Sequence, residues 1–214
     1  MNPERTISFD DWIRFYFDRT EGDWAFDPDA EEPAWLERPL DLTEHFIRLH
    51  DSANQVLRPY SSFQIGQGLW SLYSGASDFG APYTKRAVPR KHMHRAIRAV
   101  GTLVREFLPR RLSRNDLGEI HGALYMFWDI TPIWPHKTGP YEAEDLDVCL
   151  SEMQGCLTVD HPTAHYHALQ GLGHFALINP SRCREIIDLW LETRPALDNA
   201  LREYAARARD GDVQ

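Results

Sequence analysis

Apolar residues recur at intervals of three and four through most of the chain, which is the spacing of one face of an α-helix. The clearest case is 90–108, which we expect to be a single helix ended by Pro109. Its apolar face consists of Met93, Ile97, Val100, Val104, Phe107 and Leu108. Strict alternation and runs of β-branched residues, which are typical of strands, do not occur in the sequence. The pattern therefore predicts an all-α protein.

The same spacing predicts helices along the rest of the chain. They cover 42–57, 61–75, 113–130, 142–157, 161–175 and 181–211. Pro195 should divide the last of them, and Pro162 suits a first helical turn. Ser8 can cap an earlier helix that carries an aromatic stripe. We expect one domain over 1–214, in which 1–40 form an aromatic, acidic cap and 41–210 form helical repeats.

Glycines recur within the second helix of each predicted pair. Gly68, Gly122 and Gly171 are 54 and 49 residues apart, and each precedes a short apolar run. On these residues the chain resembles the HEAT-like helical-repeat proteins over roughly 41–210. The resemblance implies a short α-solenoid of about three helix pairs plus terminal helices. It also implies a concave groove that binds protein or nucleic acid, and no catalytic residue.

A glycine inside a helix costs about 1 kcal/mol relative to alanine, so a periodic one calls for a physical reason. We expect the second helices of neighbouring pairs to approach each other closely at these positions. Replacement of Gly122 or Gly171 by leucine is then expected to unfold or expand the array.

Charge is strongly segregated along the chain, although the net charge is −9. Residues 85–114 hold ten Lys and Arg against one acid, Glu106. The block includes Lys85, Arg86, Arg90, Lys91 and Arg95. It can bind a polyanion such as nucleic acid, or it can balance the acidic segments on either side within the fold. The sequence pI of about 5.5 argues against a dedicated nucleic-acid binder.

The N-terminus is polar and acidic, and no apolar run approaches the roughly 20 residues of a membrane span. We therefore expect a cytoplasmic, bacterial protein that does not enter a membrane. Three cysteines without CxxC spacing are typical of buried free thiols in a reducing compartment.

Four of the ten histidines lie within 161–175. His165 and His167 point about 200° apart on a helix, so the four side chains cannot converge on one metal ion. A zinc site built from one pair and ligands of another repeat stays open. We favour histidines that form hydrogen bonds between helices. His121, His167 and His174 are the candidates for a groove pocket, and we predict no metal, cofactor or catalytic residue.

Two predicted loops, 75–90 and 129–141, follow glycine-bearing helices and should leave the array at the same edge. They offer aromatic and basic anchors for a partner, namely Phe79, Tyr83, Lys85, Arg86, Trp134 and His136. Phe79 and Trp134 can equally cap the end of the hydrophobic core.

The sequence thus favours a non-catalytic module that binds another protein, as an adaptor or an inhibitor of the immunity type. The first alternative is polyanion binding through 85–114. The second is an enzyme with a histidine-containing site in the groove.

Overall fold

The computed structural model describes residues 7–19, 39–74, 88–131 and 142–213. These ranges contain helices and no strand, which confirms the all-α prediction. The elements are α1 (Phe9–Phe17), α2 (Pro39–Asp51), α3 (Ala53–Val56), α4 (Ser62–Tyr73), α6 (Arg90–Thr102), the π-helix η3 (Leu103–Phe107), α7 (Leu108–Arg111), α8 (Glu119–Ile130), α9 (Ala143–Cys156), α10 (Pro162–Ala176), α11 (Pro180–Glu192) and α12 (Asn199–Asp210). Within the described ranges, no helix combines the length and the apolar character needed to cross a bilayer.

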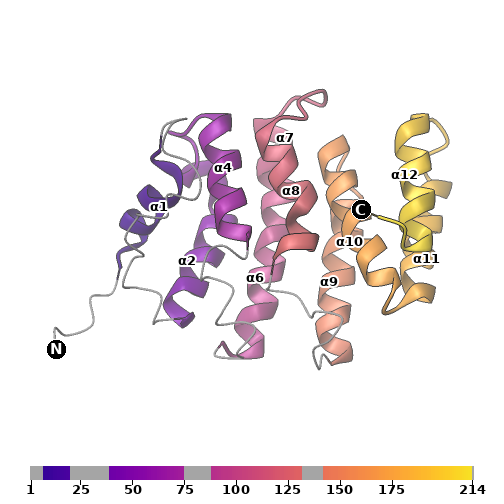
Figure 1. The fold of residues 1–214 in the computed structure, drawn as a ribbon, viewed down its shortest axis with the longest axis horizontal. Helices are drawn as coiled ribbons and strands as arrows, with labels where there is room; N and C mark the ends of the chain where they lie inside the picture. The colour runs from indigo at the N-terminus through magenta and orange to yellow at the C-terminus, as the bar shows by residue number, and fades with distance from the viewer. Residues whose placement is uncertain (1–6, 20–38, 75–87, 132–141, 214) are drawn as a thin grey trace.

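The helices stand in a row that runs from the N-terminal to the C-terminal end of the chain (Figure 1). They pack in two layers. In layer 1, α4 packs on α8, α8 on α10 and α10 on α12, and α1 covers the free side of α4. In layer 2, α2 packs on α6 and α6 on α9. α11 lies against both α10 and α12.

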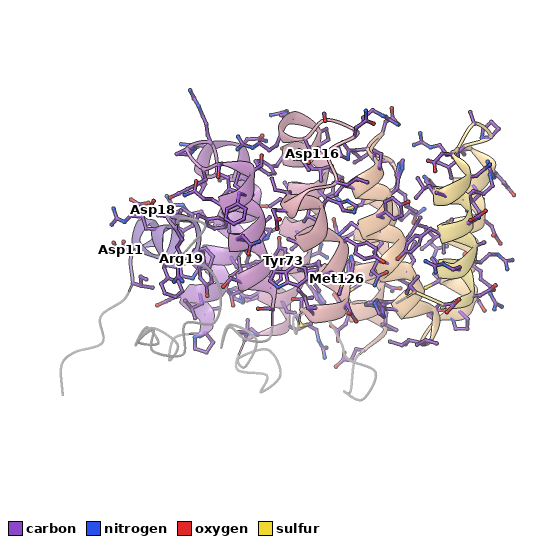
Figure 2. All side chains as sticks on the ribbon, turned by 45° about the horizontal axis from the view of Figure 1, so that its top comes forward. Asp11, Asp18, Arg19, Tyr73, Asp116 and Met126 are labelled. Carbon is purple, nitrogen blue, oxygen red and sulfur yellow. The ribbon has the colours of Figure 1, made fainter. Side chains whose placement is uncertain are left out.

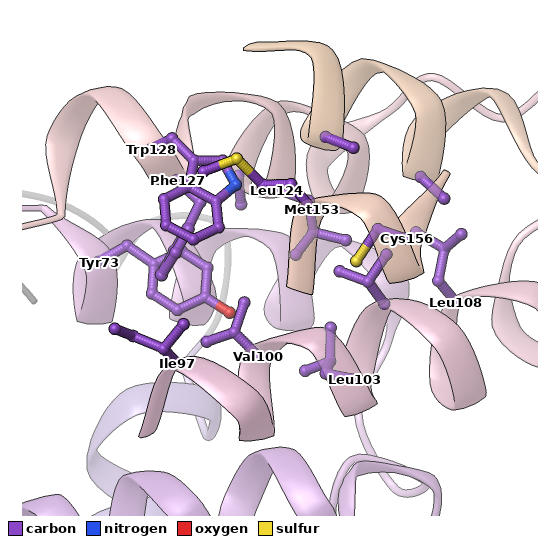
Figure 3. Close-up of a cluster of buried hydrophobic side chains, with 14 of the residues drawn as sticks. Tyr73, Ile97, Val100, Leu103, Leu108, Leu124, Phe127, Trp128, Met153 and Cys156 are labelled. Atoms are coloured by element: carbon purple, nitrogen blue, oxygen red, sulfur yellow. The ribbon is translucent and has the colours of Figure 1, made fainter. Parts of the chain in front are cut away.

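A continuous hydrophobic core separates the two layers (Figure 3). Layer 1 contributes large aromatic side chains such as Tyr73, Phe127 and Trp128, all of which are fully buried. Layer 2 contributes smaller aliphatic side chains such as Ile97 and Val100. Burial of each large apolar side chain stabilises the fold by about 1.5–3 kcal/mol, so this core holds the two layers together.

Local signals in the sequence set most helix ends. The Ser8 hydroxyl accepts a hydrogen bond from the Asp11 amide and caps α1, as expected. Pro162 occupies the first turn of α10, which its missing N–H permits. The predicted division at Pro195 is confirmed, because α11 ends before it and α12 begins after it.

Two helices are interrupted where the sequence predicts continuous ones. The expected helix 42–57 breaks at Ser52 into α2 and α3. The expected end at Pro109 is wrong, because the helix continues through Pro109 to Arg111. The wider π turn of η3 directly precedes this proline, and Leu108 N–H bonds the Leu103 carbonyl five residues back. This change of register lets the ring enter the helix without competing for an α-helical hydrogen bond.

Helices of layer 1 approach each other closely at some glycines, but not at every glycine for which the sequence predicts it. A Cβ on Gly66 of α4 would lie 2.8 Å from the Glu119 carbonyl oxygen at the start of α8. A Cβ on Gly171 of α10 would lie 2.7 Å from Trp128 of α8. Gly122 does not fit the prediction, because a Cβ there meets nothing within 4 Å. It lies on an open side of α8, so its match in spacing to Gly68 and Gly171 has no packing cause.

These positions provide a matched pair of substitutions. We expect Gly66→Ala to lower the free energy of unfolding by about 1–3 kcal/mol, since the obstructing atoms belong to a rigid backbone. We expect Gly122→Ala to raise it by up to about 1 kcal/mol, since alanine favours the helix and has open space. Urea unfolding followed by circular dichroism measures both. Equal effects of the two substitutions would contradict close packing at Gly66 and open space at Gly122.

Candidate functional site

The basic segment forms ion pairs between neighbouring helices of layer 2. Arg95 of α6 contacts Glu44 of α2 at 2.8 Å. Arg105 of η3 contacts Glu152 of α9 at 2.6 Å. Arg90, at the start of α6, contacts the carboxylates of Glu142 and Asp145. Much of the positive charge of this segment is therefore balanced within the fold.

Asp145 is the most buried acid of these contacts. It also binds His94 of α6, with 2.7 Å between Oδ1 and Nε2. Burial acts to raise the pKa of the Asp145 carboxyl, but the Glu142 backbone amide, His94 and Arg90 together lower it below its usual value. Asp145 is thus a charged group that joins α9 to α6.

The loop anchors predicted for a partner lie outside the described residues. They are Phe79, Tyr83, Lys85, Arg86, Trp134 and His136. Of the remaining predicted binding residues, Lys91 is exposed at the start of α6. The helices that precede the two loops do end side by side, because the rings of Tyr73 and Phe127 lie 4.8 Å apart.

His167 belongs to the core and not to an exposed pocket. Its ring is 1% exposed, its Nδ1–H donates to the Leu124 carbonyl, and its Nε2 accepts from the Trp128 indole. Both ring nitrogens are satisfied only when the ring is neutral. Burial accordingly lowers the pKa of His167 to about 4. This histidine is a hydrogen-bonded link between α8 and α10, the role that the sequence favours for buried histidines.

His121 and His174 instead lie at the two ends of a polar and aromatic seam between α8 and α10. We call it the α8–α10 seam, and it consists of His121, Tyr125 and Asp129 on α8, Tyr166, Gln170 and His174 on α10, and Tyr204 of α12. On each of the two facing helices the residues are spaced four apart, so they form one stripe along the helix. The fold brings the two stripes together.

One end of the seam is a hydrogen-bonded chain. The Tyr204 hydroxyl donates to Gln170 Oε1 and lies 3.1 Å from the Tyr125 hydroxyl. Gln170 Nε2 lies 3.1 Å from His174 Nε2, which is 3.5 Å from Asp129 Oδ1. A neutral His174 accepts from the Gln170 amide at Nε2. Every polar group of buried Gln170 therefore has a partner.

The other end is aromatic. The His121 ring stacks on Tyr125 at 6.0 Å and meets the edge of Tyr166 at 5.8 Å. Its Nδ1 lies 3.0 Å from the Thr163 hydroxyl. Burial and the nearby His161 lower the pKa of His121, so the ring is neutral at pH 7.

The seam is only partly covered. His121, Tyr125 and Tyr166 are half-buried and Asp129 is exposed. Beside it, Gln67 of α4 donates to Glu119 at the start of α8, and Trp70, one turn later on α4, is 38% exposed. Asp116 lies just before α8 and Met126 lies two turns into it (Figure 2). Layer 1 thus presents aromatic, amide and carboxylate groups to solvent.

The tyrosines of the seam are suited to forming neutral hydrogen bonds. Burial raises the pKa of the Tyr166 and Tyr204 hydroxyls, which stay neutral hydrogen-bonding groups. The three cysteines are buried, and burial raises the pKa of Cys156 and Cys183 to about 12, which leaves them as inert thiols. Among the residues that the structure describes, no group of three or more His, Cys, Asp or Glu could hold a metal ion.

The sequence prediction missed Tyr125, Tyr166, Gln170 and Tyr204. Tyr125, Tyr166 and Gln170 do carry a sequence signal, because each belongs to a run of polar or aromatic residues at four-residue spacing. Tyr204 carries no local signal, because only the packing of α12 on α10 places it over Gln170.

Comparison of the chain with protein-family models, with curated protein sequences and with solved structures returned no match.

Buried neutral histidines should make the fold sensitive to mild acid. Burial lowers the pKa of His50, His165 and His167 to about 4. The unfolded chain, with a histidine pKa near 6.5, takes up protons first as the pH falls. The folding equilibrium should drop by up to about tenfold per pH unit for each histidine between pH 6.5 and 4.

Urea unfolding at a series of pH values measures this slope. His167→Phe is the diagnostic variant. It should be less stable at neutral pH, because it leaves the buried Trp128 indole N–H without a partner. The number of protons linked to unfolding should fall by one, which makes the pH dependence shallower. A slope equal to that of the wild type would contradict the assignment of a neutral buried ring.

Proposed function

We propose that the chain is a HEAT-like helical-repeat array that binds another protein through the exposed side of layer 1. The contacts between neighbouring units support the repeat. Side chains of α2, α6 and α9 reach partners at nearly constant sequence separations, such as 51 for Arg95–Glu44 and 47 for Arg105–Glu152. In layer 1 the separations are 52 for Gln67–Glu119 and 42 for His121–Thr163. Similar separations from one helix pair to the next are what a stack of helix pairs produces.

The observation that carries the binding proposal is the partly exposed α8–α10 seam. Tyrosine and tryptophan dominate the energetics of protein interfaces, because they offer large, rigid surfaces with a polar tip. Here Tyr125 and Tyr166 are held by ring contacts to each other at 6.3 Å and to Tyr204. Their conformations are therefore largely settled before a partner arrives, which lowers the entropic cost of binding.

The polyanion alternative loses its main support from the ion pairs of layer 2. A binding surface for nucleic acid needs cations that are free to meet phosphates. Arg90, Arg95 and Arg105 each contact a carboxylate, and Arg111 donates to the Tyr60 carbonyl. The protein-binding function agrees better with this charge balance.

The test is capture of partners from the source cell by the full chain, with quantitative mass spectrometry and three variants. Tyr166→Ala and Trp70→Ala should each reduce recovery of the specific partner about tenfold, the effect of an interface residue worth about 1.4 kcal/mol. Leu189→Ala is the control, since Leu189 is 50% exposed on α11, outside the seam. Thermal melts establish that all variants are folded. The proposal is refuted if every recovered protein is captured equally by the wild type and by all three variants.

A further inference from the structure

We propose that the α8–α10 seam binds a cationic protein segment, with arginine side chains of the partner lying over the exposed tyrosine rings. The inference rests on the proposed function and names the chemistry of the partner.

The aromatic part of the seam suits a guanidinium group. Tyr125 and Tyr166 are both half-buried, and their rings lie 6.3 Å apart at an angle of 79°. An arginine that approaches from solvent can therefore stack on one ring while it contacts the edge of the other. The chain itself forms such a contact at the border of the seam, where Arg207 lies 5.1 Å from the centroid of the Tyr204 ring.

Carboxylates surround the aromatic part. Asp129 is exposed at the His174 end, and Glu119 is exposed two residues before His121, where it accepts from Gln67 on the α4 side of α8. Asp116 precedes α8 and acts electrostatically on His121. Asp198, at the start of α12, acts on Tyr166. Acids thus come from α8, from the turn before it and from the turn before α12.

The cations near the seam are fewer than the acids. They are Arg207, which lies over Tyr204, and Arg202 of α12, which donates to the carbonyls of Arg194 and Pro195. A cationic partner therefore meets a favourable field, whereas an acidic peptide or a nucleic acid meets repulsion. Arginine fits better than lysine, because its flat and weakly hydrated guanidinium stacks on rings.

Three labelled peptides test this with the full chain by fluorescence anisotropy. In each, serine alternates with arginine, lysine or glutamate. A length of about ten residues spans about 33 Å in extended form, the width of four helices packed 8–10 Å apart. The arginine peptide should bind about two- to fivefold more tightly than the lysine peptide, the gain of a cation–π contact at an exposed site. The glutamate peptide should not bind.

Variants of the chain then locate the site. Asp129→Asn should weaken the arginine peptide about two- to fivefold, the effect of removing one exposed charge. Tyr166→Leu should weaken it as well, whereas Tyr166→Phe, which keeps the ring, should not. Glu192→Gln is the control, because Glu192 is exposed at the end of α11. The inference is overturned if the arginine peptide does not bind, if the glutamate peptide binds equally well, or if the variants change nothing.

Failure of the cationic-partner inference can be distinguished from failure of the proposed protein binding. If Tyr166→Ala and Trp70→Ala abolish partner capture while Asp129→Asn does not, and the arginine peptide does not compete, then the seam binds a protein of other chemistry. If capture is unaffected by Tyr166→Ala and Trp70→Ala, the binding function itself fails.

Discussion

The spacing between helices of layer 1 is the constraint on which the rest of the structure depends. α4 can lie against the first turn of α8 only because Gly66 has no side chain there. α10 can approach α8 only because Gly171 leaves room for Trp128. That indole then reaches His167, whose other nitrogen binds the Leu124 carbonyl. A glycine, an indole and an imidazole thus set one distance between two helices, and the same distance brings Tyr125 and Tyr166 into contact.

Neighbouring helices are joined by different kinds of interaction in the two layers. Layer 2 uses ion pairs such as Arg95–Glu44 and the buried His94–Asp145 pair. Layer 1 uses ring contacts and neutral hydrogen bonds such as Tyr204–Gln170. Exposed ion pairs contribute little and weaken with salt, whereas packed rings and satisfied amides do not depend on ionic strength. The contacts within layer 1 are therefore less sensitive to salt than those within layer 2.

The all-α class, most helix ranges and several caps could be predicted from the sequence, because these depend on local spacing. Ser8, Pro162 and Pro195 act within a turn of their own positions. The π turn before Pro109 could not be predicted, because it is a compromise between a proline and the packing of both sides of the helix. Gly122 shows that equal spacing along the chain does not give equal surroundings, because a Cβ there meets nothing within 4 Å.

Part of the candidate site could likewise be predicted from the sequence, and part could not. His121 and His174 were candidates on composition, and both lie in the seam. His167 could not be assigned to the core from sequence, since its position relative to Trp128 depends on how α10 packs on α8. The role of Tyr204 depends on a contact between residues 34 apart, Tyr204 and Gln170, that only the tertiary fold creates.

The narrow range of sequence separations has a kinetic consequence. Contacts between neighbouring helices close loops of 39 residues for Trp128–His167, 46 for Arg114–Asp160 and 52 for Asn54–Glu106, so the entropy of closure differs little between them. In the proposed repeat array, folding can therefore begin at any adjacent pair of helices and grow in either direction. The end helices can then open and close while the middle of the row stays intact.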